Sequence, residues 1–417
     1  MVNQLINGVK SSLHVLIIAQ YFYPDIGGAS TRAYNMAQAL KLQGANVTVV
    51  TAFPHYPHGK VPLKYKGKIL IEEQINDVKT IRTWIPSLPH SSVKNRILLH
   101  LLFILSSLAA LRRVTKPDII IAMNPNLFAF YSAIMYSFIF RRKIIRNVDD
   151  LWPEVFYDLG LVKSRLAKKV LDLIAKISYS HTASVIPVSS GYTKTLTEKY
   201  KVPAEKITII EQGVDVKKFK RRTEIGSGIA GKKIVMYSGA LTEGYDFESL
   251  IQAARMLQRE PLRFVIRGTG ALYEDILRSV KDDKVLNLDL SNDILSTEEL
   301  VALMNTADIF VLPMNSGGVI DEGLPTKILE YQALGKPIVC ISAGEPGRYI
   351  LRCKSGLVVA PNQVEDLAMS IKNLAKDEAL SKELGDNGYK HVMNNLTFEK
   401  LGERLLNVIM KSLGQSE

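Results

Sequence analysis

The sequence predicts an α/β protein with two doubly wound, parallel-sheet domains, because three observations agree. The 417 residues are too many for one ordinary hydrophobic core. Short apolar runs rich in β-branched residues alternate with segments of helical periodicity. The alternation occurs in two series, separated by the polar, basic stretch 216–233. We therefore expect each series to form its own Rossmann-like sheet.

The first series begins with the apolar run 13–22, which is followed by Pro24 and a Gly-Gly pair. Its composition is that of a parallel strand covered on both faces. A helix is expected at 30–44 and a second strand at 45–53, which together complete a βαβ unit. Further buried strands are expected in this series at 118–123, 143–148, 184–188 and 207–210.

The second series contains a strand at 234–239, a helix at 247–258 and a strand with a glycine turn at 262–270. Two more strands are expected at 307–314 and 337–342. The last segment, 397–413, is amphipathic with no strand after it, so we expect it to return to the first domain. The predicted domains are 1–215 with 397–417, and 216–396, facing each other across a cleft.

Composition limits the compartment and the partners. Hydrophobic residues make up 47% and charged residues 23%, which is typical of a globular protein. Two cysteines, Cys340 and Cys353, cannot form a disulfide framework, and residues 1–12 lack a signal-peptide pattern. We therefore expect a cytoplasmic location. The net charge of +12 favours a phosphorylated substrate or an anionic membrane surface, and the absence of nucleic-acid-binding motifs argues against nucleic acid.

Two apolar runs, 97–111 and 127–140, are bordered by lysine and arginine. Both are shorter than the roughly 18–20 residues that span a bilayer. They are either core helices of the first domain or an interfacial surface whose basic border meets anionic lipid. The second interpretation would place the protein peripherally at the inner face of the plasma membrane.

The most informative stretch is 321–339, in which Glu322 and Glu330 stand eight residues apart. Pro325 marks the start of a helix and Gly335 its end, so Glu322 should lie just outside the helix and Glu330 inside it. The backbone amides of Thr326 and Lys327 lie between the two carboxylates, and the Lys327 charge would offset that of a diphosphate. Carboxylates accept hydrogen bonds from sugar hydroxyls, and a helix N-terminus attracts phosphate, so the arrangement suits a nucleoside-diphosphate sugar.

A simpler interpretation of the same stretch is also open. Lys327 and Glu330 are three residues apart and could form an ordinary surface ion pair. Glu322 would then be a loop carboxylate without a ligand.

Several motifs occur in an order that resembles one known family. They are YFYPDIGGASTRAYNMAQAL (21–40), DDLWPE (149–154), EQGVD (211–215), ADIFVLP (307–313) and TKILEYQALGKPIV (326–339). Together they resemble the family-4 glycosyltransferases of the GT-B fold, in particular a subgroup that assembles surface polysaccharides. The resemblance covers nearly the whole chain.

The resemblance implies transfer of a sugar, with retention of anomeric configuration, from a nucleoside-diphosphate sugar to a lipid-linked glycan or another cell-surface glycoconjugate. The donor is a substrate, and no separate cofactor is implied. The catalytic candidates are Glu322, Asp149 and Asp150. The donor-binding candidates are Gly27, Gly28, Gly239, Arg267, Gly268, Leu324, Thr326, Lys327 and Glu330. For the two aspartates, a helix N-cap with a turn is the alternative role.

The sequence departs from the family pattern at the phosphate contacts. Ala240 stands where the family often has arginine, and no lysine follows it, so Arg267 and Lys327 are the candidate replacements. No D-x-D motif is present, and we therefore expect no metal requirement. Two other functions are compatible with these departures: a non-catalytic subunit that binds nucleotide sugar, and a GT-B-like epimerase.

Overall fold

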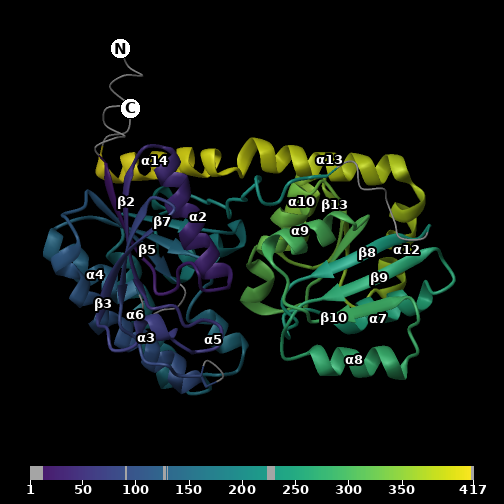
Figure 1. The fold of residues 1–417 in the computed structure, drawn as a ribbon, viewed down its shortest axis with the longest axis horizontal. Coiled ribbons are helices and arrows are strands. Elements are labelled where there is room, and N and C mark those ends of the chain that lie inside the picture. The colour runs from purple at the N-terminus through teal and green to yellow at the C-terminus, as the bar shows by residue number, and fades with distance from the viewer. Residues whose placement is uncertain (1–12, 90–91, 125–127, 129, 223–230, 415–417) are drawn as a thin grey trace, which may run out of the picture. The chain divides into compact units, whose positions relative to one another are not determined.

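The computed structural model describes residues 13–89, 92–124, 128, 130–222 and 231–414. The chain forms two compact units (Figure 1). Unit 1 comprises residues 1–213 and 398–417, and unit 2 comprises residues 214–397. The first boundary lies two residues before the position expected from the sequence, and the second lies one residue after it.

Unit 1 is built around a seven-stranded sheet in the order β3-β4-β2-β1-β5-β6-β7. All neighbouring strands are parallel except β3 and β4, which pair antiparallel at one edge. The strands are β1 (His14–Ile18), β2 (Asn46–Ala52), β3 (Leu70–Ile75), β4 (Val78–Thr83), β5 (Ile119–Asn124), β6 (Ile144–Val148) and β7 (Ser184–Pro187).

Helices cover both faces of this sheet. They are α2 (Gly28–Leu42), α3 (Val93–Ser107), α4 (Phe130–Phe140), α5 (Glu154–Asp158), α6 (Arg165–Ser180) and α14 (Phe398–Leu413). Short turns complete the unit: η1 (Leu63–Tyr65), η2 (Leu108–Arg113), η3 (Ser190–Tyr192), the π-helical η4 (Thr195–Lys199) and η5 (Ala204–Lys206).

The alternation of side chains along β1 explains this two-sided arrangement. Val15 and Ile17 pack in a core with α2 and α14, whereas Leu16 and Ile18 pack in a second core with α3 and α4. Helix α14 lies against α2, and Gly402 permits the approach, since a Cβ there would lie 2.5 Å from the Ala39 carbonyl oxygen. Unit 1 accordingly includes this last helix.

Unit 2 has a fully parallel six-stranded sheet in the order β10-β9-β8-β11-β12-β13. Its strands are β8 (Lys233–Ser238), β9 (Leu262–Arg267), β10 (Leu288–Ser291), β11 (Ile309–Pro313), β12 (Ile338–Ile341) and β13 (Gly356–Val359). Its helices are α7 (Phe247–Met256), α8 (Tyr273–Asp282), α9 (Thr297–Asn305), α10 (Thr326–Ala333), α11 (Glu345–Cys353), α12 (Val364–Lys376) and α13 (Glu378–Asn395), with a 3-10 turn η6 (Gly318–Glu322).

The fold class predicted from the sequence is confirmed, with corrections to individual strands. The strand expected at 207–210 is wrong: Ile207 makes only an isolated bridge to Val185. The β3–β4 hairpin, β10 and β13 were not anticipated. Both strands of the hairpin mix charged and polar residues with apolar ones, so they lack the continuous apolar run that marks the central strands.

Candidate functional site

The start of helix α10 lies between the two glutamates of the stretch 321–339, as predicted. It begins at Thr326, after Pro325, and Gly335 follows its end with φ +68°. Glu322 ends the turn η6 before the helix, and Glu330 lies within the helix. Within the part of the chain that the structure describes, no side chain caps the N-terminus of α10. Leu324 packs against the core of unit 2, which anchors the loop between Glu322 and the helix.

Glu330 is partly buried, and burial raises the pKa of its carboxyl to about 7, with Lys327 opposing the rise. The ion pair that the spacing could have produced does not form among the described residues. The Lys327 amine instead donates to the Tyr245 hydroxyl at 2.9 Å. The simpler interpretation of this pair as a surface salt bridge is therefore wrong, and the Glu330 carboxylate remains available to a ligand.

Glu322 is held by an ionic contact. Its Oε2 lies 2.6 Å from the guanidinium of Arg348 on α11, and Arg348 also contacts Glu345, whose carboxylate is buried. This bridge fixes the Glu322 side chain outside the mouth of α10. A sugar hydroxyl bound by Glu322 would therefore donate to a carboxylate that is already paired with Arg348.

Lys327 lies beside the turn that follows β8. A Cβ at Gly239 would fall 1.7 Å from the Lys327 Cε, so only glycine leaves room for this side chain. The amine is also 4.7 Å from the ring centroid of Tyr245 and 5.8 Å from that of Tyr237. The lysine charge thus lies beside the turn that contains Ala240, the position where the sequence pattern would have led us to expect an arginine.

The turns after β8 and β9 interlock through backbone contacts. A Cβ at Gly268 would lie 1.6 Å from the Gly239 carbonyl oxygen, and both glycines have φ between +150° and +155°. Arg267 is buried, and its guanidinium donates to the Asp293 carbonyl at 2.6 Å. Of the two candidate replacements for the missing arginine, Lys327 is therefore the one that lies against the Gly239 turn.

In unit 1, Gly27 and Gly28 form the start of α2 at the carboxyl end of β1. The Tyr56 ring lies against Gly27, where a Cβ would be 2.9 Å from it, while the space beside Gly28 is open. Asp25 holds this arrangement, because its Oδ1 accepts from the amides of His55 and Tyr56, each at 2.8 Å. Burial raises the pKa of Asp25 to about 6.

Asp149 and Asp150 follow β6 and have different surroundings. Asp149 is mostly buried, with its Oδ1 3.1 Å from Arg32 Nε and 2.8 Å from Asn147 Nδ2, and Asp150 is exposed. Neither caps α5, whose N-cap is Pro153. The N-cap alternative is therefore wrong, and Asp149 is part of a buried network centred on Arg32.

Three residues important to this geometry were not among the sequence candidates. Tyr245 holds Lys327, Arg348 holds Glu322, and Arg32 holds Asp149. Arg32 could have been found, because it is a charged residue on the apolar face of the helix after the Gly-Gly turn. The other two carry no such signal, since tyrosine and arginine are ordinary at loop and helix surfaces.

Comparison with known proteins agrees with this architecture. A family model described as Glycosyltransferase Family 4 matches residues 26–218, and one described as Glycosyl transferases group 1 matches residues 220–391. Among curated proteins, the chain is 25% identical over 394 residues to a putative colanic acid biosynthesis glycosyl transferase, WcaI, of Escherichia coli K12, with 90% of this chain and 96% of that protein covered.

Solved structures show the same fold. Sucrose-phosphate synthase from Thermosynechococcus elongatus superposes with a TM-score of 0.75 at 17% identity, over 97% of this chain and 100% of that one. Anabaena Alr3699/HepE, solved in complex with UDP, gives a TM-score of 0.69 at 15% identity, over 96% and 100% of the two chains. The two family models together span most of the sequence, and the chain belongs to the family-4, group-1 glycosyltransferases of the GT-B fold.

Proposed function

We propose that this glycosyltransferase moves a sugar from a nucleoside-diphosphate sugar, with retention of configuration, to a lipid-linked glycan or another cell-surface glycoconjugate. Unit 2 binds the donor: Glu330 accepts from the ribose hydroxyls, Glu322 accepts from the sugar hydroxyls, and the N-terminus of α10 faces the diphosphate. Positioning and charge stabilisation supply most of the rate enhancement, because the leaving phosphate itself takes the acceptor proton.

The observation that carries this proposal is the placement of Lys327. It is directed to the Gly239 turn by Tyr245 while Glu330, three residues later, keeps a carboxylate without an ion pair among the described residues. A cation for phosphate and an acceptor for hydroxyls are thus presented on successive turns of one helix. Anabaena Alr3699/HepE, whose structure was solved with UDP, has the same fold.

Thermal-shift measurements with UDP, GDP, ADP and dTDP identify the donor base, because a ligand that binds only the folded protein raises its melting temperature. The matching nucleotide sugar is then incubated with and without membrane extract. We expect a glycosylated product with the extract and an unchanged donor without it. Conversion of the donor to an epimer without acceptor, or no stabilisation by any nucleotide, would contradict the proposal.

We further propose that Lys327 takes the place of a metal ion at the diphosphate. Replacing Lys327 with methionine keeps the volume and removes the charge, and we expect donor affinity to fall about tenfold or more, since hydrogen bonds to charged groups contribute about 1.5–3 kcal/mol. Turnover of the wild-type protein should be unchanged by EDTA. Tyr245→Phe is the graded comparison, with a smaller loss because it frees Lys327 without removing it. Abolition of turnover by EDTA would refute the proposal.

A separate set of observations concerns the membrane. Unit 1 contains 30 Lys and Arg against 16 Asp and Glu, a net charge of +14, whereas unit 2 contains 23 against 25, a net charge of −2. Of the 24 exposed large hydrophobic side chains described, 18 belong to unit 1. Positive charge and exposed apolar surface thus coincide on one unit, which is the combination that anionic lipid attracts.

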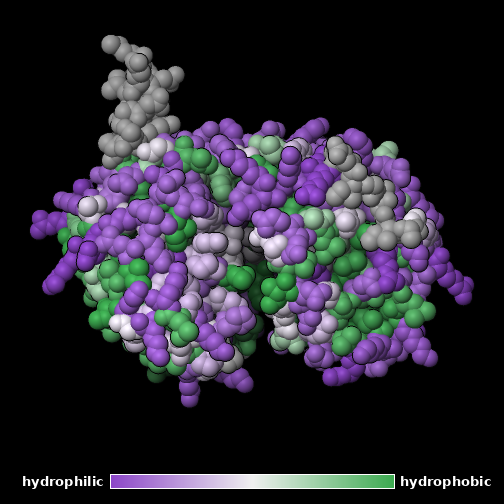
Figure 2. All heavy atoms as spheres, in the orientation of Figure 1, coloured by the Kyte–Doolittle hydropathy of each residue, from purple (hydrophilic) through white to green (hydrophobic). Residues whose placement is uncertain are grey.

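Nine of these 18 exposed side chains of unit 1 lie on the layer formed by α3, α4 and α6. Helix α4 contacts α3, and the Tyr131 hydroxyl of α4 donates to the Ile174 carbonyl of α6 at 3.0 Å, so the three helices are neighbours. The apolar residues exposed on this layer are Leu98, Leu101, Leu105, Phe138, Ile139, Leu166, Val170, Leu173 and Ile177. Figure 2 shows apolar patches on this unit, over the region where Figure 1 labels α3 and α4.

One of these helices meets the length and composition of a membrane span. Within the described residues this is the helical stretch Lys94–Arg113, which is longer than its apolar run because η2 continues α3. Leu99 and Phe103 on the same helix are fully buried in the core of unit 1. A helix with one face in the core can offer lipid only its other face, so we propose a peripheral, interfacial contact at the inner face of the plasma membrane.

Helix α6 supplies the sharpest test of this contact. Leu166, Val170, Leu173 and Ile177 form an exposed stripe, opposite the buried face of the helix. We expect sedimentation of the protein with phosphatidylglycerol vesicles at low salt, and release as salt rises. Leu166→Ser with Leu173→Ser should weaken binding about tenfold or more, given about 1.5–3 kcal/mol for a fully buried leucine.

The matched control is Leu286→Ser with Ile294→Ser in unit 2, whose side chains are 81% and 88% exposed and should leave vesicle binding unchanged. Equal loss in both variants, or no binding of the wild-type protein at low salt, would remove the membrane proposal. Concentration-dependent dimers that disappear in the α6 variant would assign the stripe to a second copy of the chain instead.

A further inference from the structure

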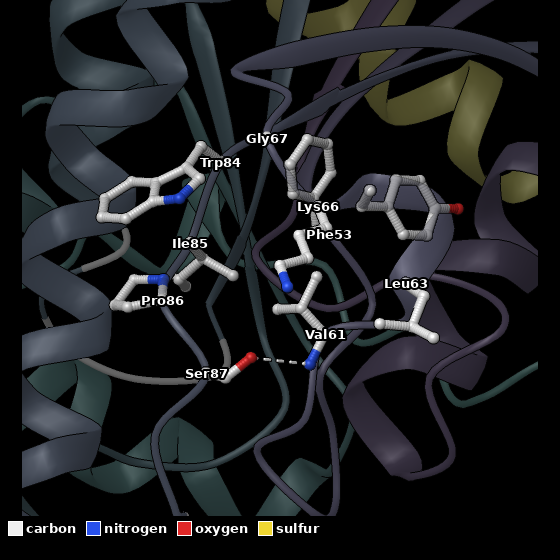
Figure 3. A pocket seen from close by; sticks show the side chains of 10 residues that line it. Phe53, Val61, Leu63, Lys66, Gly67, Trp84, Ile85, Pro86 and Ser87 are labelled. Atoms are coloured by element: carbon white, nitrogen blue, oxygen red, sulfur yellow. Dashed lines mark hydrogen bonds between the residues drawn. The ribbon is translucent and has the colours of Figure 1, made fainter.

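A cavity of about 330 Å³ lies within unit 1, apart from the residues assigned above to the donor. Phe53, at the end of β2, and Trp84 and Ile85, at the end of β4, form one part of it, and the segment 61–67 forms the other (Figure 3). Carboxyl ends of parallel strands share one edge of a sheet, so the cavity lies at the same edge as the Gly27–Gly28 turn after β1.

The walls of the cavity are fixed by specific contacts. The Val61 amide donates to the Ser87 hydroxyl at 3.0 Å, which joins the two sides (Figure 3). At the base, Phe53 stacks on Tyr65 with ring centroids 4.8 Å apart, and the Tyr65 hydroxyl donates to Glu73. Gly59 passes so close to the backbone of Leu88 that a Cβ would lie 1.9 Å from its carbonyl oxygen. The cavity is therefore built into the fold.

Large apolar side chains line the opening without being covered by the protein. Leu63 is 84% exposed and Trp84 is 42% exposed, and Val61 and Pro86 are partly buried beside them. A tryptophan and a leucine left in water on a cavity rim represent apolar surface that an apolar ligand would bury.

The polar groups of the lining narrow the class of ligand. The Ser87 hydroxyl accepts from the Val61 amide and the Tyr65 hydroxyl donates to Glu73, and the one charged group among the lining residues is the amine of Lys66. Figure 3 shows the Lys66 side chain reaching between the two walls. Among the described residues no carboxylate pairs with Lys66, whereas neighbouring Lys64 pairs with Glu73 at 3.3 Å. Lys60 and Lys68 are exposed on the same segment and add positive charge.

We propose that this cavity binds the phosphate-bearing end of a lipid phosphate, with the apolar chain between Leu63 and Trp84 and the phosphate at Lys66. The inference rests on the proposed glycosyl transfer and names the lipid-linked class of acceptor. A neutral glycan fits less well, because a ring of hydroxyls needs several hydrogen-bond partners and the lining offers few. At about 330 Å³ the cavity is near the lower limit for ligand sites and takes only the phosphate-proximal end of the chain.

A structural link joins this cavity to the Gly27 turn. The segment 54–60 begins after Phe53, a lining residue, and carries the amides of His55 and Tyr56 that Asp25 binds. The Tyr56 ring of the same segment lies against Gly27. An acceptor phosphate bound by Lys66 would thus contact the segment 61–67, which directly follows the segment that packs against the start of α2.

The test uses calorimetry of the full chain with farnesyl phosphate, below its micelle concentration, and with farnesol. We expect farnesyl phosphate to bind more tightly than farnesol. Leu63→Ser should weaken both about tenfold, and Lys66→Ala should weaken only farnesyl phosphate, by about fivefold to tenfold. Leu63 is so exposed that its replacement leaves the core intact. Lys64→Ala, on the same loop, and Leu286→Ser, on the surface of unit 2, are matched controls that should leave binding unchanged.

Several results would overturn the proposal. They are equal affinity for the wild-type protein and the Leu63 and Lys66 variants, farnesol binding as tightly as farnesyl phosphate, or binding of a neutral oligosaccharide that Trp84→Ala abolishes. Nucleotide-sugar binding is measured on the same samples. If the wild-type protein binds the nucleotide sugar but not farnesyl phosphate, only the cavity proposal is refuted. If the wild-type protein does not bind the nucleotide sugar, the proposed function is refuted.

Discussion

Replacing Glu330 with glutamine should weaken nucleotide-sugar binding by about 1.5–3 kcal/mol, the usual range for hydrogen bonds to a charged group. The reason is that a carboxylate accepts from two neighbouring hydroxyls, whereas glutamine presents one acceptor and one donor. The position of Glu330 on α10, with Lys327 directed to Tyr245, leaves the carboxylate for this task. Isothermal titration with the cognate nucleotide sugar measures the loss.

The pH dependence of the same equilibrium is a sharper test. Burial raises the pKa of Glu330 to about 7, so the carboxylate forms as the pH rises from about 6 to 8. Donor affinity of the wild-type protein should increase over this range, and that of Glu330→Gln should not. The intact nucleotide sugar is the correct ligand, because its diphosphate diester does not titrate there. Parallel pH profiles for the two proteins would exclude Glu330 from the donor site.

Stability should change in the opposite direction. A carboxyl whose pKa is raised in the folded state binds its proton more tightly there than in the unfolded chain, so stability falls as pH rises through the interval between the two pKa values. Glu330→Gln removes that penalty and should make unit 2 more stable than the wild type at pH 8. A site residue that costs stability when unliganded is expected where a charge is kept for a ligand.

Replacing Arg32 with methionine should destabilise unit 1 by about 3–5 kcal/mol, because it leaves the buried Asp149 carboxylate without its counter-ion. Arg32 is 2% exposed and also donates to Asn147 and to the Ile210 carbonyl, each at 2.8 Å. Both tryptophans of the chain, Trp84 and Trp152, belong to unit 1, so their fluorescence during chemical denaturation reports this unit alone.

The double variant Arg32→Met with Asp149→Asn distinguishes the cost of the unpaired carboxylate from the cost of the changed side-chain shape. Removing the orphaned carboxylate should restore part of the stability, as a positive coupling in the double-mutant cycle. Asp149→Asn alone should keep turnover if Asp149 only positions Arg32 and should lose it if Asp149 contacts the reacting sugar. An unchanged denaturation midpoint for Arg32→Met would show that the buried ion pair contributes nothing measurable.

The two glutamates illustrate how far spacing alone leads. Pro325 and Gly335 determine where α10 starts and stops through local backbone preferences, so the positions of Glu322 and Glu330 relative to the helix followed from the sequence. The residues with which Lys327 and Glu322 interact did not follow from the sequence. Lys327 is three residues from Glu330, but its amine donates to Tyr245, which is 82 residues distant along the chain. Glu322 pairs with Arg348, which belongs to the next helix.

The sequence by itself determined the two-sheet α/β class, most strands of the central layers and the α10 motif, because apolar periodicity and helix-end signals are local properties of the chain. The tertiary structure alone decided which polar groups meet: Lys327 with Tyr245, Asp149 with Arg32, and Lys66 with the walls of an apolar cavity. It also decided which apolar residues remain outside, as on α6. Such contacts join segments far apart in sequence, and their free energy depends on burial and distance, which no local pattern specifies.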